Sequence, residues 1–289
     1  MQAAILAQAP HALASFARLA AAMNARIAHN APLAGTHPGA RHLRALRGML
    51  ELIGFDGDDT LWHSQDFYDA AQVEFERIVG QYVDLADARV HDRLLAIEAG
   101  NIGVFGYGAK GMTLSMIEAA FDITGGTISS GDLHRLVGLG KEVLAHPVEL
   151  LPGIRDAVET VAAAHRIVLI TKGDLIHQQA KVQRSHLGDL FHRIEIVSEK
   201  DPAAYARVLH ECAVAPAAFA MVGNSLRSDI APVVELGGWG VYMPYHSTWS
   251  LELDPEFVTD TPRVVQVGEA SAIPAAIVCL ARAAATAER

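Results

Sequence analysis

The sequence predicts an α/β fold in which a doubly wound parallel sheet carries an inserted, all-helical cap. From Pro152 onward, short apolar runs alternate with segments of helical periodicity, which is the pattern of a parallel sheet covered by helices. An isolated apolar run at 50–55 precedes this pattern and ends in acidic residues, which favours a buried first strand. Between about 64 and 148 the periodicity is helical throughout, with no convincing strand. We therefore expect an N-terminal extension at 1–48, a core at 49–63 and 149–289, and a cap at 64–148.

Each expected element of the core follows from a local signal. The helix after Pro152 and Gly153 begins with a typical helix-start residue. The expected strands are 50–55, 166–170, 193–197, 219–222, 240–243 and 263–267, and the expected helices are 152–164, 174–185, 202–212, 229–236 and 270–285.

The cap is expected to contain helices that each bury one apolar stripe. A fourth cap helix is expected to begin at Ser130 and Asp132, which are good capping residues, and to run through Leu144. The first three stripes are Phe67, Ala70, Ala71, Phe75 and Ile78; then Leu94, Leu95 and Ile97; then Leu114, Ile117, Ala120 and Phe121.

The N-terminal extension differs in composition from the rest of the chain. The first fifty residues hold five arginines and no Asp, Glu or Lys. They fit an amphipathic targeting segment, a partner-binding helix, or a chain that physiologically starts near Met49. The simplest interpretation is a dispensable, poorly packed extension, so removal of residues 1–48 is expected to leave activity intact.

The overall composition excludes several classes of function. The 289 residues carry a formal net charge of -10 and only two cysteines, Cys212 and Cys279, without a C-x-x-C pair. These features disfavour nucleic-acid binding, a zinc site and a disulfide framework, and they favour a cytoplasmic protein. No apolar stretch reaches the length of about 18 residues that a membrane span needs. A small phosphorylated metabolite remains a suitable ligand, and the oligomeric state is not predicted.

Polar residues collect where four predicted strands end. Asp56-Gly57-Asp58-Asp59-Thr60 follows the first strand, Thr171-Lys172-Gly173-Asp174 the second, Lys200 the third, and Gly223-Asn224-Ser225 with Asp229 the fourth. In a parallel doubly wound sheet these ends meet at one edge, where ligands bind. The sequence therefore predicts one site built from all four segments.

The charges of this site indicate a cation and a phosphoryl group. Two carboxylates about 4 Å apart repel by roughly 4 kcal/mol at an effective dielectric constant near 20, so Asp56, Asp58 and Asp229 together favour a bound cation. All-oxygen donors suit Mg²⁺. Such an ion with Lys200 suits a transferring phosphoryl group, which the Asp56 carboxylate can attack. Asp58 can protonate the leaving alcohol and later activate water.

These residues resemble the four motifs of haloacid-dehalogenase-superfamily phosphatases that carry a small helical cap after the first motif. The resemblance covers about Glu51 to the C-terminus and implies a Rossmann-like core. It implies that Asp56 is nucleophile and magnesium ligand, that Asp58 is acid/base and a ligand through its carbonyl, and that Asp229 completes the metal site. Thr171 and Lys200 would hold the phosphoryl oxygens, with Lys181 as the alternative lysine. Further phosphate contacts are expected from Thr60, Lys172, Gly173 and Asn224.

Two positions depart from the pattern of that superfamily. Asp59 stands where Gly is usual, as in a branch of small-metabolite phosphatases, and it can simply cap the following turn. Asn224 stands where an acid is frequent, which places more of the metal binding on Asp229.

The segment 103–111 contains four glycines, two aromatic residues and a lysine, and we expect it to be a flexible loop over the substrate. Tyr107 or Lys110 is expected to contact the leaving group. Segment 245–249, with Trp249, is a second candidate rim.

The expected activity is Mg²⁺-dependent hydrolysis of a small phosphorylated metabolite through an aspartyl-phosphate on Asp56. The alternatives are a hydrolase of C–halogen or C–P bonds on the same fold, and a non-catalytic phospho-acceptor or binding module. A dehalogenase would have no use for Asp58 as an acid, and a C–P hydrolase would need an imine-forming lysine such as Lys110.

Overall fold

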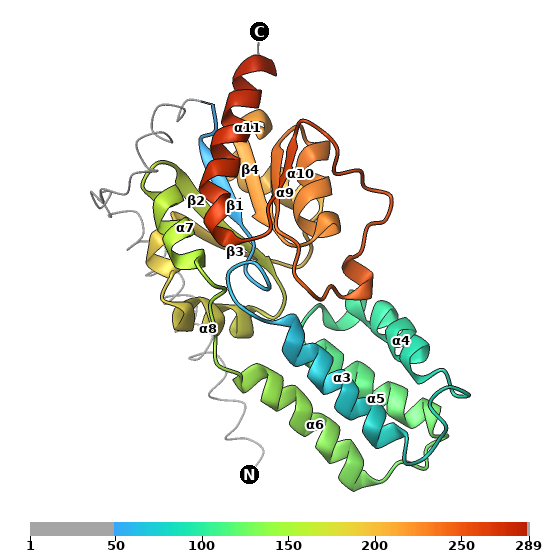
Figure 1. Cartoon of the computed structure of the whole chain (residues 1–289). Coiled ribbons are helices and arrows are strands. Elements are labelled where there is room, and N and C mark those ends of the chain that lie inside the picture. Colours follow the sequence, from blue (N-terminus) through green and yellow to red (C-terminus); the bar gives the residue numbers. More distant parts are fainter. Residues whose placement is uncertain (1–48, 288–289) are drawn as a thin grey trace.

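The computed structural model describes residues 49–287, and a six-stranded parallel sheet forms their centre (Figure 1). The N-terminal extension and the expectations for it lie outside the described residues. The order of strands across the sheet is β3-β2-β1-β4-β5-β6. The strands are β1 (Leu52–Phe55), β2 (Arg166–Lys172), β3 (Arg193–Val197), β4 (Phe219–Gly223), β5 (Trp239–Tyr242) and β6 (Val264–Gln266).

This topology explains why the site residues meet. All five strand pairs are parallel, and β1 lies between β2 and β4. The first strand therefore ends beside two others, and the chain order reverses on either side of it, which is the position where open α/β sheets bind ligands. The predicted doubly wound parallel core is confirmed.

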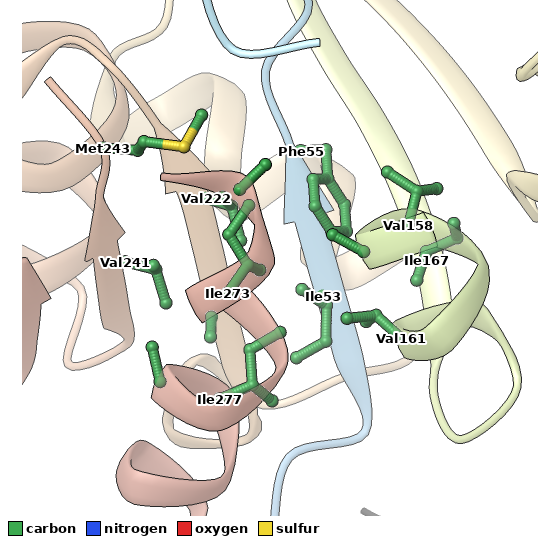
Figure 2. Close-up of a cluster of buried hydrophobic side chains, with 14 of the residues drawn as sticks. Ile53, Phe55, Val158, Val161, Ile167, Val222, Val241, Met243, Ile273 and Ile277 are labelled. Atoms are coloured by element: carbon green, nitrogen blue, oxygen red, sulfur yellow. The ribbon is translucent and has the colours of Figure 1, made fainter. Parts of the chain in front are cut away.

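Helices cover both faces of the sheet. One apolar core lies under α7 (Ile154–Ala162) and α11 (Ile273–Ala287), and Figure 2 shows Ile53 and Phe55 of β1 between these two helices. The opposite face packs on α9 (Pro202–Glu211) and α10 (Ala231–Glu235) through a second apolar core. The remaining core elements are α8 (Leu175–Ser185) and the single turns η1 (Gly188–Leu190), η2 (Pro216–Ala218), η4 (Ser250–Glu252) and η5 (Ala270–Ala272).

The segment between β1 and α7 forms a four-helix cap with an apolar core of its own (Figure 1). The predicted third stripe is wrong at Leu114 and Phe121, which are 43% and 56% exposed, whereas its other members, Ile117 and Ala120, pack in the cap core. Helix α5 carries two apolar stripes, and the one with Met112 and Met116 is buried. The cap helices are α3 (Gln65–Val79), α4 (Val90–Phe105), α5 (Ala109–Ile123) and α6 (Ser130–Ala145).

Helix α6 approaches α5 closely at a glycine. A Cβ atom at Gly140 would lie 1.8 Å from Thr113 Oγ1. The hydroxyl of Thr113 itself donates to the Ala109 carbonyl at 2.6 Å, one turn earlier in α5. This contact requires glycine at position 140, and it sets the separation of the two helices.

The chain leaves the core and returns to it through two paired segments, a junction that we call the cap ladder (61–63 and 149–151). The His63 amide donates to the Glu149 carbonyl at 3.0 Å, and the Leu151 amide donates to the Leu61 carbonyl at 3.0 Å. Trp62 is bridged to Leu150 between these bonds. The two chain crossings between core and cap therefore lie together in one short ladder beside the end of β1.

Two expected elements differ from the structure. The expected helix at 229–236 is a π-helical turn, η3 (Leu226–Ile230), followed by α10. The expected loop at 103–111 is only 106–108, because α4 continues through Phe105 and α5 begins at Ala109. The positive φ angles of Gly106 and Gly108 allow the sharp reversal between the two helices. Within residues 49–287, no helix has the length and hydropathy that crossing a bilayer needs.

Candidate active site

A cavity of about 180 Å³ lies between the carboxyl ends of β1, β2 and β4 and the cap. The polar residues predicted at the strand ends surround its floor. Those that line it are Asp56, Asp58, Asp59, Thr171, Lys172, Asp174, Lys200, Asn224, Ser225 and Asp229.

Asp56, Lys200 and Asp229 form a buried ionic triad. The Lys200 ammonium donates to Asp56 Oδ1 and, at 2.7 Å, to Asp229 Oδ1. All three residues are at most 6% exposed. Burial, together with Asp229 and Asp58, raises the pKa of Asp56 to about 7 against the opposing effect of Lys200. The two carboxylates raise the pKa of Lys200 despite its burial, so it remains an ammonium.

The π-helical turn directs Asp229 back onto β4. The Ser225 amide donates to Asp229 Oδ2 at 3.0 Å, and the Ser225 hydroxyl caps the turn by accepting from the Ser228 amide. A Cβ atom at Gly223 would lie 2.2 Å from Asp229 Oδ2. Position 223 therefore has room only for glycine, and this glycine allows the carboxylate to reach Lys200.

The Asp58 side chain turns away from Asp56 toward the base of the cap. Its carboxylate accepts hydrogen bonds from Trp62 Nε1 at 2.6 Å, Lys181 Nζ at 2.7 Å and Gln178 Nε2 at 2.8 Å. Burial opposes ionisation of Asp58, but Lys181 and the two neutral donors outweigh it, and its pKa lies below the usual range. Asp58 is therefore a carboxylate held by three fixed donors.

Asp59 fixes the start of the first cap helix. It has a positive φ of 61°, and its carboxylate accepts from the amides of Ser64 at 2.8 Å and Gln65 at 3.0 Å. Burial and the neighbouring Asp58 raise the pKa of Asp59 to about 7. The structure thus places Asp59 as a cap of α3, the simpler of its expected roles.

Asn224 faces two oxygens of the β1 segment. Its amide nitrogen can donate to Asp56 Oδ2 at 3.2 Å and to the Asp58 carbonyl at 3.1 Å. In the opposite orientation of the amide, the Asn224 oxygen takes the place of the nitrogen and faces the same two oxygens. Three such oxygens are the ligands that a hard divalent cation prefers. Among residues 49–287 no three His, Cys, Asp or Glu side chains converge as a metal cluster. A magnesium site here would use one carboxylate, one carbonyl and one amide oxygen.

Thr60 and Thr171 are the two threonines that the sequence places at the site. Both are fully buried, at 0% and 1% exposure. The Thr60 hydroxyl lies 3.4 Å from Asp56 Oδ2 and 3.3 Å from the Asn224 amide, whereas Thr171 ends β2 on the cavity wall.

Lys172 is engaged by the protein itself. Its ammonium donates to Glu252 and, at 2.8 Å, to the Ser228 hydroxyl, and it lies 4.0 Å from the centre of the Tyr107 ring. The carbonyl of Lys172 accepts from Gln178 at 2.9 Å, and Gly173 follows with a φ of 132°. These contacts join the η4 turn to the end of β2. They also neutralise the positive charge of Lys172 within the protein.

Tyr107 and Lys110 contact the core rather than the cavity floor. The Tyr107 hydroxyl donates to Glu199 at 2.6 Å, and its ring lies edge-on to Trp249 on the cavity wall. Lys110 pairs with Asp174 at 2.8 Å and does not line the cavity. Both residues hold the cap against the core in this structure.

Several lining residues were not predicted from the sequence. Gln178 stands three positions before Lys181 on α8, so both side chains reach Asp58 from one helix face. That spacing was available as a signal, with Lys181 as its starting point. Glu98 and Asn101 of α4 line the cap side, and nothing in the local sequence distinguishes them from surface residues.

Comparisons with known proteins agree on the superfamily. The family model for haloacid dehalogenase-like hydrolases matches residues 50–237. A haloacid dehalogenase-like family hydrolase from Xanthomonas campestris is 48% identical over 83% of this chain and 95% of that chain, with a TM-score of 0.75.

More distant structures share the fold. A 2-haloacid dehalogenase from Pseudomonas syringae pv. Tomato is 20% identical over 79% of this chain and 98% of that chain, with a TM-score of 0.52. The HAD-hydrolase YfnB from Bacillus subtilis, bound to magnesium, is 15% identical over 77% and 96%, with a TM-score of 0.51. No curated protein matches.

Proposed function

Because the chain belongs to the haloacid dehalogenase-like hydrolase family, we propose that it is a Mg²⁺-dependent phosphatase that forms an aspartyl-phosphate on Asp56. The observation that carries the proposal is the second carboxylate, Asp58, which lines the same cavity as Asp56 and is held by three donors. Hydrolysis of a phosphomonoester needs a group that first gives a proton to the leaving alcohol and later takes one from water. Displacement of a halide needs no such acid, so Asp58 favours phosphate chemistry.

In the first step, an oxygen of Asp56 attacks phosphorus, the bond from phosphorus to the leaving oxygen breaks, and that oxygen takes a proton from Asp58. The negative charge of a bound phosphoryl group raises the pKa of Asp58, so Asp58 takes up a proton when the substrate binds. In the second step, water attacks phosphorus and gives its proton to Asp58, and the bond from phosphorus to Asp56 breaks. Phosphate leaves together with the proton that Asp58 took up when the substrate bound, so that Asp56 is released and Asp58 is a carboxylate again.

The remaining residues of the site orient these groups. Lys200 holds Asp56 in place and offers an ammonium to the phosphoryl oxygens. Thr171 presents a hydroxyl from the end of β2 to the same oxygens. Lys181 holds the Asp58 carboxylate at the base of the cap. The two lysines thus have separate roles, one at the nucleophile and one at the acid.

The residues present fit a magnesium ion. Three hard oxygen ligands are available, namely Asp56 Oδ2, the Asp58 carbonyl and the amide oxygen of Asn224. Asp229 is hydrogen-bonded to Lys200 next to them. When bound, Mg²⁺ would neutralise charge on the phosphoryl oxygens. Asn224 thereby becomes a better candidate ligand than the phosphate contact expected from the sequence.

The test is hydrolysis of p-nitrophenyl phosphate with Mg²⁺ and with EDTA. We expect turnover that depends on Mg²⁺, a loss of about 10³-fold or more in kcat for Asp56→Asn, and a loss of about 10²- to 10⁴-fold for Asp58→Asn. Asp122→Asn, at an exposed position of α5, is the matched control and should retain wild-type activity. Full activity in EDTA or in Asp56→Asn contradicts the proposal. So does release of halide from a 2-haloacid by a protein that leaves phosphomonoesters intact.

A further inference from the structure

The cap side of the cavity contains one charged side chain, and it is acidic. Among residues 49–287, the cap residues that line the cavity are amides, serine hydroxyls, aromatic and apolar groups, with Glu98 of α4 as the single titratable acid or base other than tyrosine. The charge that a leaving group meets beyond the phosphoryl position is therefore that of Glu98.

No positive charge on the described cavity wall is left for a second anion. The lining cations are Lys172 and Lys200, and no arginine lines the cavity. Lys200 lies between two buried carboxylates at the nucleophile. Lys172 lies between Glu252 and Glu199. A leaving group with its own carboxylate or phosphate would face a wall of excess negative charge, which is unfavourable in a partly enclosed cavity, where charges are screened less than in bulk water.

Two amide groups on the cap wall, those of Asn101 and Gln72, have used their donors within the protein. Asn101 Nδ2 donates to Ser115 Oγ at 3.1 Å and to Glu118 at 2.8 Å. Gln72 Nε2 is bonded to Glu76 at 3.3 Å and to His91 at 2.7 Å. Each amide nitrogen has two hydrogens, so the atoms that remain for a ligand are the carbonyl oxygens.

Gln178 provides independent support for the same conclusion. It is 3% exposed, lines the cavity, and has its amide orientation fixed by bonds to Asp58 and to the Lys172 carbonyl. Its Oε1 atom is buried and has no hydrogen-bond partner. Buried acceptors normally have a hydrogen-bond partner, so we expect a water molecule or a ligand to donate a hydrogen bond to this atom.

Glu98 is held where it can meet a ligand. It is hydrogen-bonded to Trp249, which reaches the cavity from the segment after β5. Burial raises the pKa of Glu98 to about 7, because an indole donor and His91 offset only part of the loss of water. A hydroxyl or ammonium of a ligand would supply the missing stabilisation.

We propose, on the basis of the proposed phosphatase function, that the substrate is a phosphomonoester of a polyol or amino alcohol, without a second negative charge, and that Glu98 selects it. The carbonyl oxygens of Asn101, Gln72 and Gln178 accept from its hydroxyl or amino groups. Glu98 accepts from the same groups and repels a carboxylate at that place. Phosphorylated hydroxy acids are accordingly poor substrates.

Two matched sets of substrates test this assignment. The two-carbon set is phosphoethanolamine, 2-hydroxyethyl phosphate and phosphoglycolate, and the six-carbon set is glucosamine 6-phosphate, glucose 6-phosphate and 6-phosphogluconate. Each set differs mainly in presenting an ammonium, a hydroxyl or a carboxylate. The readout is kcat/KM, or inhibition of p-nitrophenyl phosphate hydrolysis where turnover is slow. We expect the carboxylate member of the better-bound set to be disfavoured by roughly tenfold to a hundredfold.

Glu98→Gln separates the charge of this residue from its hydrogen bonding. The variant should reduce the preference for ammonium over carboxylate by about tenfold. Glu142→Gln, at an exposed position of α6, is the matched control and should leave the preference unchanged.

The outcomes distinguish this inference from the proposed function. A wild-type protein that hydrolyses p-nitrophenyl phosphate but prefers the carboxylate members overturns the selection by Glu98 and leaves the phosphatase function intact. An unchanged preference in Glu98→Gln does the same. A folded protein that hydrolyses no phosphomonoester with Mg²⁺ overturns both.

Discussion

Replacement of Lys200 by methionine tests the buried ionic triad directly. The side chain is 2% exposed and neutralises two carboxylates that are themselves 9% and 1% exposed. Methionine has a similar length and no charge, so Lys200→Met leaves Asp56 and Asp229 buried without a counter-ion. Loss of one partner from a buried ion pair destabilises a protein by about 3–5 kcal/mol. Proton uptake by one carboxylate relieves part of this, so we expect a loss of about 3 kcal/mol near neutral pH.

The assay is urea unfolding followed by circular dichroism, with Lys110→Met as the matched control. Lys110 makes an ion pair of 2.8 Å with Asp174, but its side chain is 49% exposed, so its removal should destabilise by about 1 kcal/mol or less. The loss in Lys200→Met should be smaller at about pH 6 than at about pH 8, because the two unpaired carboxylates are protonated more readily at the lower pH. Millimolar Mg²⁺ should restore part of the stability of Lys200→Met. If Lys200→Met loses no more stability than Lys110→Met, the triad does not neutralise the site as described.

Two further predictions concern the cap. Because burial raises the pKa of Glu98 from 4.5 to about 7, the folded state loses stability as the pH rises through that interval. Glu98→Gln should therefore be about 1–3 kcal/mol more stable than wild type near pH 8 and equal to it near pH 5. Urea unfolding at both pH values measures the difference. A wild-type stability that rises between those pH values relative to Glu98→Gln would contradict this sign. Gly140→Ala should destabilise by about 1–3 kcal/mol in thermal unfolding, because the new methyl group overlaps the Thr113 hydroxyl; Thr113→Ala should recover part of the loss in the double variant, and strict additivity would refute the contact.

The floor of the site could be predicted because strand ends in a parallel sheet are fixed in space by the topology. Asp56 and Asn224 directly follow β1 and β4, Thr171 lies at the end of β2, and the structure places all three on one cavity. Lys200 lies three residues after the end of β3 and still reaches Asp56 and Asp229, because α9 begins directly afterwards with Asp201 as its N-cap. The sequence alone could therefore identify these residues.

The roles of Lys181 and Gln178 depend on something the strand pattern does not contain. Which face of α8 points toward Asp58 is set by the turn between β2 and that helix, where Gly173 has a φ of 132°. The sequence left Lys200 and Lys181 as alternatives for one role, whereas the structure places them on different carboxylates. The two lysines are therefore not alternatives, because the site contains both.

The cap was harder to predict than the core because helical periodicity allows more than one buried face. Helix α5 has two apolar stripes, and tertiary packing against α6 at Gly140 decides which one is buried. The glycines at 103–111 indicated a long loop, yet Gly103 and Gly111 lie within helices. Their conformational freedom is used at Gly106 and Gly108 only.

The cap ladder has a consequence for how the two halves of the molecule depend on each other. Trp62 lies within it, and the same indole donates to Asp58. A rotation of the cap about the bonds at His63 and Leu151 displaces that indole, so the movement that admits a ligand also changes the hydrogen bonding of the proton donor. A chain lengthened at position 150 would therefore alter ligand entry and proton transfer together, although the insertion touches neither the nucleophile nor the cavity wall.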